Sequence, residues 1–313
     1  MSSAERKFDD AARAAWLAYI GGCKQDEIAQ IMGISRQSAQ RLVSQALSAG
    51  LVKARIDHPI ARCMELARDL ELRYRLTVCE VVPSLDTPAS SGLAVSHATG
   101  DMIERFLTRG EPLVVGLGTG RTLRAAVEHL PHLDCAQHKI VSLTGTISPD
   151  GSTAYYNVLF TIADKVTATT FPLPLPVITA SAGERQALLG QKTLQTTREL
   201  SARTDVRFVG IGTMNEEAPL LMDGFITAQD QRRLQQKGAV GEIIGYVFDR
   251  DGRLLDDEVN QRVSSALLSP SPAGPTIAAA NGPGKLPAIR AALSGGLING
   301  LVTDEATALA LTT

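Results

Sequence analysis

The residues of this sequence that could bind a small anion begin with a glycine-rich turn within Val114–Leu123, between an apolar run and a helix start. Backbone N–H groups in such a turn converge on an anion, and the dipole at the helix N-terminus adds to the attraction. Two threonine hydroxyls and an arginine, which can hold a phosphate with two hydrogen bonds, complete the expected cradle. Its members are Gly118, Thr119, Gly120, Arg121 and Thr122. The alternative is a strand-to-helix turn that binds no ligand.

Two further stretches place a single charged side chain beside a turn. We interpret Lys237–Gly245 as a glycine-rich turn before a strand, and its one acid, Glu242, could accept hydrogen bonds from sugar hydroxyls. In Ala279–Leu293 a strand ends, the chain turns at a Gly-Pro-Gly sequence and a helix begins at Lys285, whose charge could hold a phosphate. The alternatives are a solvated loop acid and an ordinary exposed lysine.

A different chemistry, the reading of DNA, is indicated near the N-terminus by Gln25–Ala39. A small Ala29 stands four residues before Gly33, as two steeply crossing helices require at their contact and at their turn. Ser35 can cap the second helix, whose first turns would then meet base edges as a recognition helix does. The candidate contacts to double-stranded operator DNA are Arg36, Gln37, Ser38, Gln40 and Arg41.

The elements that must position these DNA-contacting side chains are short helices. Apolar periodicity predicts helices over residues 8–20, 24–32 and 35–48, and the alternation in Leu51–Ile56 predicts a short strand or wing. An amphipathic helix then runs from Pro59 to about Tyr74, either as a linker or as an oligomerisation helix. We therefore expect a helix-turn-helix domain over residues 1–57 and a second, larger domain over residues 58–313, with residues 58–75 as a candidate linker helix.

From residue 76 onward, short β-branched runs alternate with helical stretches, which predicts a Rossmann-like α/β domain with a mostly parallel sheet. Ligands of such sheets bind outside the carboxyl ends of the strands. The expected strands are 77–82, 113–117, 139–143, 166–170, 206–211, 245–248, 276–280 and 300–303. The expected helices are 92–108, 121–130, 153–163, 184–190, 192–201, 227–235, 256–262 and 284–293.

Composition and charge agree with a DNA-binding N-terminal domain and a separate larger domain. The 313 residues carry a net charge of −2, but residues 1–56 hold eight basic and five acidic side chains, or +3, which leaves −5 for the rest. A basic N-terminal segment on an otherwise acidic chain is expected of a DNA-binding protein. The four cysteines and five histidines lack metal-ligand spacing, so we expect no metal or cofactor. Without a signal-peptide pattern or a membrane-length apolar run, we expect a cytoplasmic protein.

Taken together, these stretches resemble the SorC family of bacterial sugar-responsive regulators, and the resemblance spans almost the whole chain. Its most specific part is Lys285–Ala308, which is similar to the family's C-terminal signature nearly residue for residue, and Gly116–Leu123 and Gly238–Ile243 match two further blocks. The resemblance implies a helix-turn-helix and an effector domain related in fold to ribose-5-phosphate isomerase and glucosamine-6-phosphate deaminase. It also implies a homo-oligomer, typically a tetramer, whose DNA affinity a phosphorylated sugar alters.

Carried over by position, the resemblance assigns the residues Gly118–Thr122 to the phosphate, Glu242 to hydroxyl groups and Lys285 to the phosphate. The turn that contains Thr144 and Gly145 should line the same pocket, and Asn157 is a further candidate on the next helix. Some members carry a charge where this sequence has neutral Thr144, which argues against a second phosphate or a covalent imine. The N-terminal residues 14–17 and 21–22 resemble those of regulators of polyol breakdown, such as erythritol.

The sequence thus predicts a transcription regulator of a sugar or polyol catabolic operon, controlled allosterically by a small phosphorylated sugar or polyol. Repression relieved by the ligand is favoured, although no residue determines the sign of regulation. The rival interpretation is a sugar-phosphate isomerase or deaminase with an appended DNA-binding head. Aldose–ketose chemistry needs a positioned base and acid, and the turn Thr213–Glu217 differs from the acid-rich catalytic turn of such isomerases. We therefore do not expect an enzyme.

Overall fold

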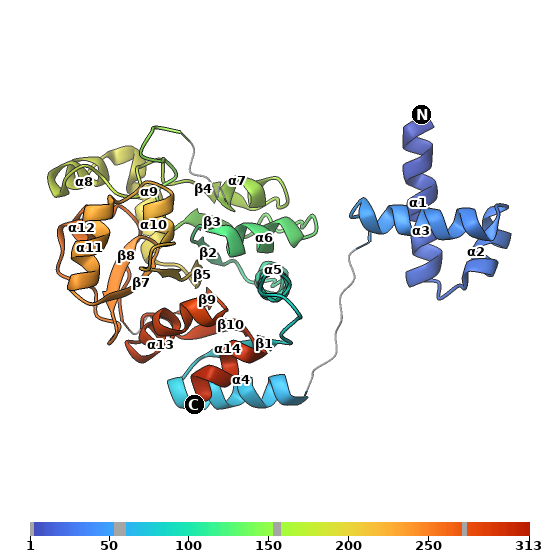
Figure 1. Cartoon of the computed structure of the whole chain (residues 1–313). Helices are drawn as coiled ribbons and strands as arrows, with labels where there is room; N and C mark the ends of the chain where they lie inside the picture. The colour runs from blue at the N-terminus through green and yellow to red at the C-terminus, as the bar shows by residue number, and fades with distance from the viewer. Residues whose placement is uncertain (1–2, 53–60, 153–157, 271–273) are drawn as a thin grey trace. The chain divides into compact units, whose positions relative to one another are not determined.

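The computed structural model describes residues 3–52, 61–152, 158–270 and 274–313 and divides the chain into two compact units, residues 1–58 and 59–313 (Figure 1). The division falls one residue beyond the predicted domain boundary. Among the described residues, no helix is both long and apolar enough to cross a membrane.

The described part of the small unit consists of three helices, α1 (Ser3–Tyr19), α2 (Gln25–Met32) and α3 (Arg36–Ser48). Gly33 ends α2 in the left-handed region, with φ of 66°, and the next amide, that of Ile34, donates to the Ala29 carbonyl at 2.9 Å. Small buried residues, with one isoleucine, let the three helices approach closely. These are Ala14, Ile28, Ala29 and Ala39.

Two predictions for this unit differ from the structure. The first helix begins at Ser3 and not at residue 8, and the predicted wing is not seen in the described part of the chain. Leu51 and Val52 have no strand structure, and the remainder of the predicted strand, residues 53–56, lies outside the described residues.

The cap predicted for α3 is present and provides a stability test. The Ser35 Oγ accepts a hydrogen bond from the Ser38 amide at 3.2 Å. Ser35→Ala should therefore destabilise the small unit by about 1 kcal/mol. Urea unfolding followed by the fluorescence of Trp16, the one tryptophan of the chain, measures this effect within the small unit. Ser44→Ala, in the middle of the same helix, is the matched control, and an unchanged midpoint in Ser35→Ala would contradict the role of the cap.

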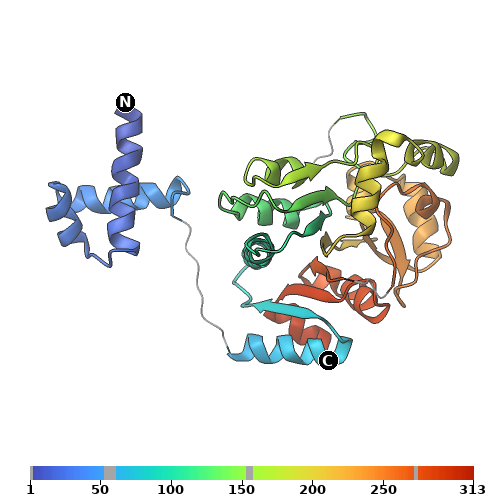
Figure 2. The same ribbon diagram turned by 180° about the vertical axis from the view of Figure 1, so that it is seen from behind.

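The large unit is built on a parallel sheet of seven strands in the order β1-β10-β9-β5-β2-β3-β4 among the described residues (Figures 1 and 2). The predicted fold class is confirmed. The strands of this sheet are β1 (Val78–Val82), β2 (Val114–Leu117), β3 (Lys139–Ser142), β4 (Thr169–Phe171), β5 (Val206–Gly210), β9 (Thr276–Ala279) and β10 (Gly300–Asp304).

A smaller antiparallel sheet of β6 (Gly212–Thr213), β7 (Ala239–Ile243) and β8 (Tyr246–Asp249) follows the main sheet. The strands β6 and β7 were not among the predicted ones, and the interpretation of Lys237–Gly245 as a turn is wrong. The turn itself is confined to residues 244–245, where both φ angles are positive, at 46° and 89°. The glycines suggested a loop, whereas pairing on both sides makes this segment a central strand.

Helices cover both faces of the main sheet. One hydrophobic cluster joins α5, α6 and α7 to it, and another joins α4, α13, α14 and the small sheet to it. The α-helices are α4 (Ala61–Tyr74), α5 (Pro88–Leu107), α6 (Arg121–His129), α7 (Val158–Ala163), α8 (Ala182–Leu189), α9 (Gln195–Ala202), α10 (Pro219–Met222), α11 (Ala228–Gln236), α12 (Glu258–Arg262), α13 (Leu286–Ser294) and α14 (Glu305–Thr312), with 3-10 turns η1 (Lys192–Leu194) and η2 (Pro283–Lys285). Helices α10 and α14 were not predicted.

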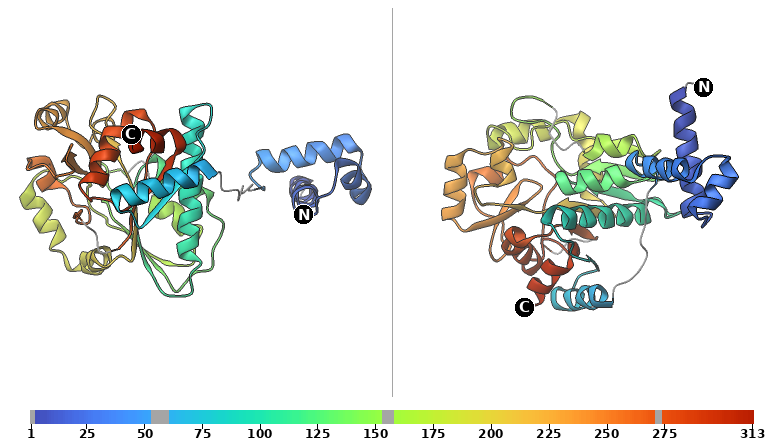
Figure 3. Two further views of the ribbon diagram at one scale, coloured as in Figure 1. Left: turned by 90° about the horizontal axis from the view of Figure 1, so that it is seen from below. Right: turned by 45° about the vertical axis from the view of Figure 1, so that its right-hand side comes forward.

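The helix α4, for which the sequence left open a linker or an oligomerisation role, packs on the body of the large unit. Its Cys63, Leu66 and Leu70 are buried in the same cluster as α14, and the Tyr74 hydroxyl donates to the Leu311 carbonyl at 3.2 Å. Figure 3 shows α4 in light blue beside the red C-terminal helix. The described part of this segment is therefore not a free linker.

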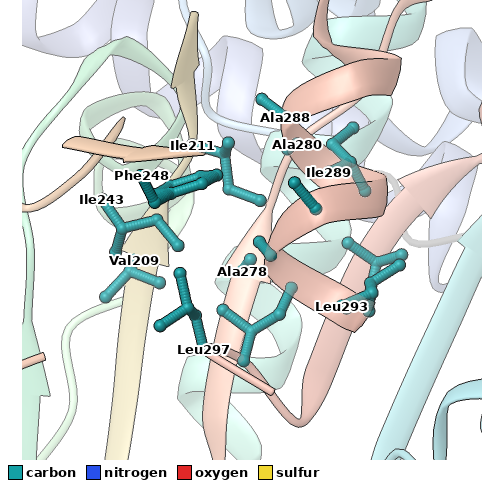
Figure 4. Packing of buried hydrophobic residues seen from close by; sticks show 14 of the residues in the cluster. Val209, Ile211, Ile243, Phe248, Ala278, Ala280, Ala288, Ile289, Leu293 and Leu297 are labelled. Atoms are coloured by element: carbon teal, nitrogen blue, oxygen red, sulfur yellow. The ribbon is translucent and has the colours of Figure 1, made fainter. Parts of the chain in front are cut away.

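Figure 4 shows the apolar packing between the small sheet and α13. This packing brings two candidate site residues near each other. The small side chains of Ala278, Ala280 and Ala288 let α13 approach β9 of the main sheet, beside the ring of Phe248 from the small sheet. A Cβ atom at Gly241 would lie 2.6 Å from that of Ala288, so β7 passes directly against the helix. Glu242 follows Gly241 on β7, and Lys285 directly precedes α13.

Candidate functional site

A pocket of about 1120 Å³ lies at the carboxyl end of the main sheet. The segments that directly follow β2, β3, β5 and β9 contribute to its wall, together with β7 and the region around α10. This is where open parallel sheets bind their ligands, because the loops after the strands meet there.

The predicted cradle forms one wall of this pocket through Thr119, Gly120, Arg121 and Thr122. Gly120 precedes α6 with φ of 123°, a conformation that favours glycine, and Arg121 is the first residue of the helix. The N-terminus of α6 and an exposed guanidinium therefore face the same space. Gly118 does not line the pocket. Its amide donates to the Phe208 carbonyl at 2.8 Å, and its lack of a side chain serves packing.

Glu242 lies on β7 with its carboxyl group in the pocket wall. Its Oε2 accepts a hydrogen bond from the Gly245 amide at 2.8 Å, and the side chain covers Gly212, where a Cβ atom would come within 2.9 Å of the Glu242 Cγ. Burial raises the pKa of Glu242, while the Gly245 amide and the charge of Lys285 oppose that rise. The alternative of a solvated loop acid therefore does not hold.

Lys285 also lines the pocket and stands at the end of η2, directly before α13. It is half-buried, and burial lowers its pKa. The negative charge of Glu242 opposes this shift, and the positive charge of Arg121 adds to it. The two cations thus act on one region of the pocket, each at a helix N-terminus, which is an arrangement that favours a bound anion.

Of the other predicted residues, the structure brings Thr144 into the pocket wall and leaves Gly145 outside it. A Cβ atom at Gly145 would lie 2.7 Å from the Pro176 backbone, so this glycine allows two segments to pack. Asn157 lies outside the described residues.

Several polar residues of the pocket were missed, among them Asn281 and Asp223. Asn281 comes two residues after β9, so the rule that ligands gather at the carboxyl ends of strands could have found it. Asp223 follows the short helix α10 and carries no sequence signal. Burial raises the pKa of Asp223, and the charge of Arg121 opposes that rise, which indicates that the two groups share an electrostatic environment.

The predicted DNA-contacting residues lie on α3 of the small unit. Four of them are exposed: Arg36, Gln37, Gln40 and Arg41. The Arg36 Nε lies 3.4 Å from the Asp26 carboxylate of α2. Ser38 is half-buried, and its Oγ accepts a hydrogen bond from the Ser35 hydroxyl at 2.9 Å, so it contributes to the cap. Ser44, one turn beyond Gln40, is exposed on the same face and was not predicted.

The histidine that is fully buried has a structural role. His138 Nδ1 accepts from the Leu113 amide at 3.0 Å, and its Nε2 lies 3.0 Å from the Leu107 carbonyl. Within the described ranges, no group of three or more histidine, cysteine or acidic side chains could hold a metal ion.

Comparison with known proteins covers both units. The family model described as "Putative sugar-binding domain" matches residues 58–313. The chain is 33% identical over 301 residues to the erythritol catabolism regulatory protein EryD of Brucella abortus, covering 96% of this chain and 95% of that protein. It is 30% identical over 306 residues to the transcriptional regulator LsrR of Klebsiella pneumoniae, covering 96% and 91%.

The fold has the same relatives. The crystal structure of the full-length sorbitol operon regulator SorC from Klebsiella pneumoniae matches 97% of this chain and 98% of its own, with a TM-score of 0.78 at 23% identity. These relatives are named as regulators and not as isomerases or deaminases, which decides between the two interpretations of the sequence. The matched domain and the identity along the whole chain show that it belongs to the SorC family of sugar-binding transcriptional regulators.

Proposed function

We propose that this regulator controls a sugar or polyol catabolic operon and that its effector is a small phosphorylated sugar or polyol bound in the pocket at the carboxyl end of the sheet. One observation carries the proposal. Arg121 and Lys285, each at a helix N-terminus, share this pocket with the Glu242 carboxylate. Cations at helix N-termini suit a phosphate, and a carboxylate suits hydroxyl groups.

The roles of the residues follow from their positions. Arg121 and the backbone amides of the cradle hold the phosphate, with Lys285 as the second charge. Glu242 accepts hydrogen bonds from hydroxyl groups, and Thr144 contributes a further hydroxyl contact. Because the relative EryD is by name a regulator of erythritol catabolism, a four-carbon polyol phosphate is the first compound to test.

Effector binding would change DNA affinity through a homo-oligomer, which we propose to be a tetramer. Paired helix-turn-helix units read two half-sites whose spacing must match the spacing of the units. An effector that bridges the cradle, Glu242 and Lys285 would favour one arrangement of the subunits over another. A coupling free energy of about 1–3 kcal/mol between the two sites is typical of such control.

The function is tested by a thermal-shift screen of the full-length protein against sugars, polyols and their phosphates, followed by operator binding with each hit. A ligand at ~100-fold its dissociation constant should stabilise the protein by about 2.7 kcal/mol. Stabilisation confined to phosphorylated compounds, with altered operator affinity, supports the proposal. Stabilisation by free polyols alone would contradict the proposal that the effector is phosphorylated. Ligands that stabilise the protein but leave operator affinity unchanged would contradict the regulatory role.

The raised pKa of Glu242 predicts how effector affinity depends on pH. As the pH falls through this raised pKa, the carboxylate takes up a proton and loses acceptor capacity for the hydroxyl groups. Affinity should therefore fall as the pH is lowered through this raised pKa, by about tenfold once the carboxylate is protonated, since hydrogen bonds to a charged group are worth about 1.5–3 kcal/mol. Isothermal titration at several pH values measures this fall.

Glu242→Gln is the matched control for that measurement. The amide does not titrate, so the variant should bind more weakly at neutral pH and keep only the pH dependence of the ligand phosphate, near pH ~6. A variant with the full pH dependence of the wild type would show that Glu242 does not meet the ligand.

A further inference from the structure

A second pocket, of about 760 Å³, lies in the large unit. Its wall includes Thr204 and Pro275, which come shortly before β5 and β9, together with parts of α8, η1 and α9. Among the described residues, it shares no lining residue with the effector pocket. Tyr246 in its wall follows the turn at residues 244–245 that lines the effector pocket, so one hairpin contributes to the walls of both pockets.

The charge of this second pocket is strongly positive. Its described lining residues include one acid, Glu199, and four basic residues on four different elements. The cations are Arg185, Lys192, Arg198 and Arg207. A Glu199 oxygen already accepts a hydrogen bond from the Gln195 amide group at 2.9 Å. The excess of positive charge matches an anionic ligand.

Backbone carbonyl groups hold the guanidinium groups in place. Arg185 Nε donates to the Val263 carbonyl at 2.5 Å, and Arg198 Nη1 donates to the Leu189 carbonyl at 2.6 Å. A guanidinium has five N–H donors, so each of these two keeps several for a ligand. None of the pocket's cations forms an ion pair with a carboxylate in the described part of the chain.

Arg207 is the most deeply placed of these cations. It is half-buried, and it donates to the Ser201 carbonyl at 3.1 Å and to the Leu267 carbonyl at 3.2 Å. These contacts orient the guanidinium but bring no negative charge to it. Burial lowers the pKa of Arg207, because desolvation disfavours the charged form.

We propose that this pocket is a second ligand site, separate from the effector pocket, for a small metabolite that carries two or more negative charges on phosphate groups. Arg185, Arg198 and Lys192 bind the phosphates at the pocket rim, and Arg207 supplies the charge at its base. Leu173 and Tyr246 in the wall contact the carbon skeleton of the ligand. Guanidinium groups that are already oriented lose little freedom on binding, which favours affinity.

The test uses the full-length protein and pyrophosphate as the probe, titrated calorimetrically in a phosphate-free buffer. We expect saturable binding to the wild type and at least ~10-fold weaker binding to the double variant Arg185→Gln/Arg198→Gln, which loses two charge-assisted contacts. Arg203→Gln removes an exposed charge at the end of α9 outside the pocket and should bind as the wild type does. Arg121→Gln, in the effector pocket, should retain this binding event.

Three outcomes would overturn the proposal. They are the absence of saturable binding to the wild type, equal loss in Arg203→Gln, and loss in Arg121→Gln with retention in the double variant. The last outcome would place the anion in the effector pocket. Lys192→Gln repeats the test with a single exposed residue should the double variant fail to fold, and it should weaken binding several-fold.

Discussion

Replacing Arg121 with alanine should remove the response at effector concentrations that saturate the wild type, while operator binding stays intact. Arg121 is the first residue of α6 and places an exposed guanidinium in the pocket wall beside the cradle amides. Hydrogen bonds to charged groups contribute about 1.5–3 kcal/mol, so effector affinity should fall about 10–100-fold. Isothermal titration with the effector and operator binding across an effector series measure the two parts of this prediction separately.

Arg124→Ala is the matched control, because it lies one turn further along the same helix. Its Nε pairs with the Glu128 carboxylate at 2.9 Å, and it does not line the pocket. The control should leave the effector dose–response unchanged. If Arg121→Ala gives the same dose–response as the wild type, the segment Gly118–Thr122 is only a strand-to-helix turn.

The cradle and Lys285 could be predicted from the sequence because their signals are local. In both places an apolar strand, a glycine turn and a helix start follow one another within a few residues, and the fold then puts them at one edge of the sheet. The steep turn before α3 and its serine cap are equally local, and both are present.

The sequence could not show what each glycine is for. Gly118 and Gly145 were assigned to the ligand, whereas in the structure they allow close packing against other segments of the chain. Gly241 has the same purpose against α13 and Phe248, and this is why β7 was mistaken for a turn. Some glycines let a ligand come close to the backbone, and others let another segment of the chain come close. The two kinds look identical in the sequence until the neighbouring segment is known.

The acids of the effector pocket illustrate the same limit. Glu242 was identified from the sequence through the glycines on either side of it. Its place in a strand was not predicted, and this place explains why the carboxylate is partly buried. Asp223 belongs to a stretch without strand or motif, and only the tertiary fold brings it near Arg121. Residues that meet through long-range packing leave no periodic signal in the sequence.

Replacing Arg36 or Gln37 with alanine should weaken operator binding and leave effector binding unchanged. Both side chains are exposed in the first turn of α3, the part of a recognition helix that meets base edges. A bidentate contact to a base is worth about 1–3 kcal/mol, so each substitution should weaken binding by roughly 5–150-fold. Fluorescence anisotropy with operator DNA at constant salt measures the loss, and footprinting locates it.

Arg13→Ala separates base reading from general charge attraction, because it removes the same charge from an exposed position on α1 of the same unit. Loss of one phosphate-type contact lowers affinity for all sequences and reduces the salt dependence. Arg36→Ala should lose more operator affinity than Arg13→Ala does. It should also reduce the preference of the protein for the operator over other DNA sequences. Equal losses in the two variants would mean that Arg36 contributes only charge, and footprints identical to wild type in Arg36→Ala and Gln37→Ala would place the reading face elsewhere on the small unit.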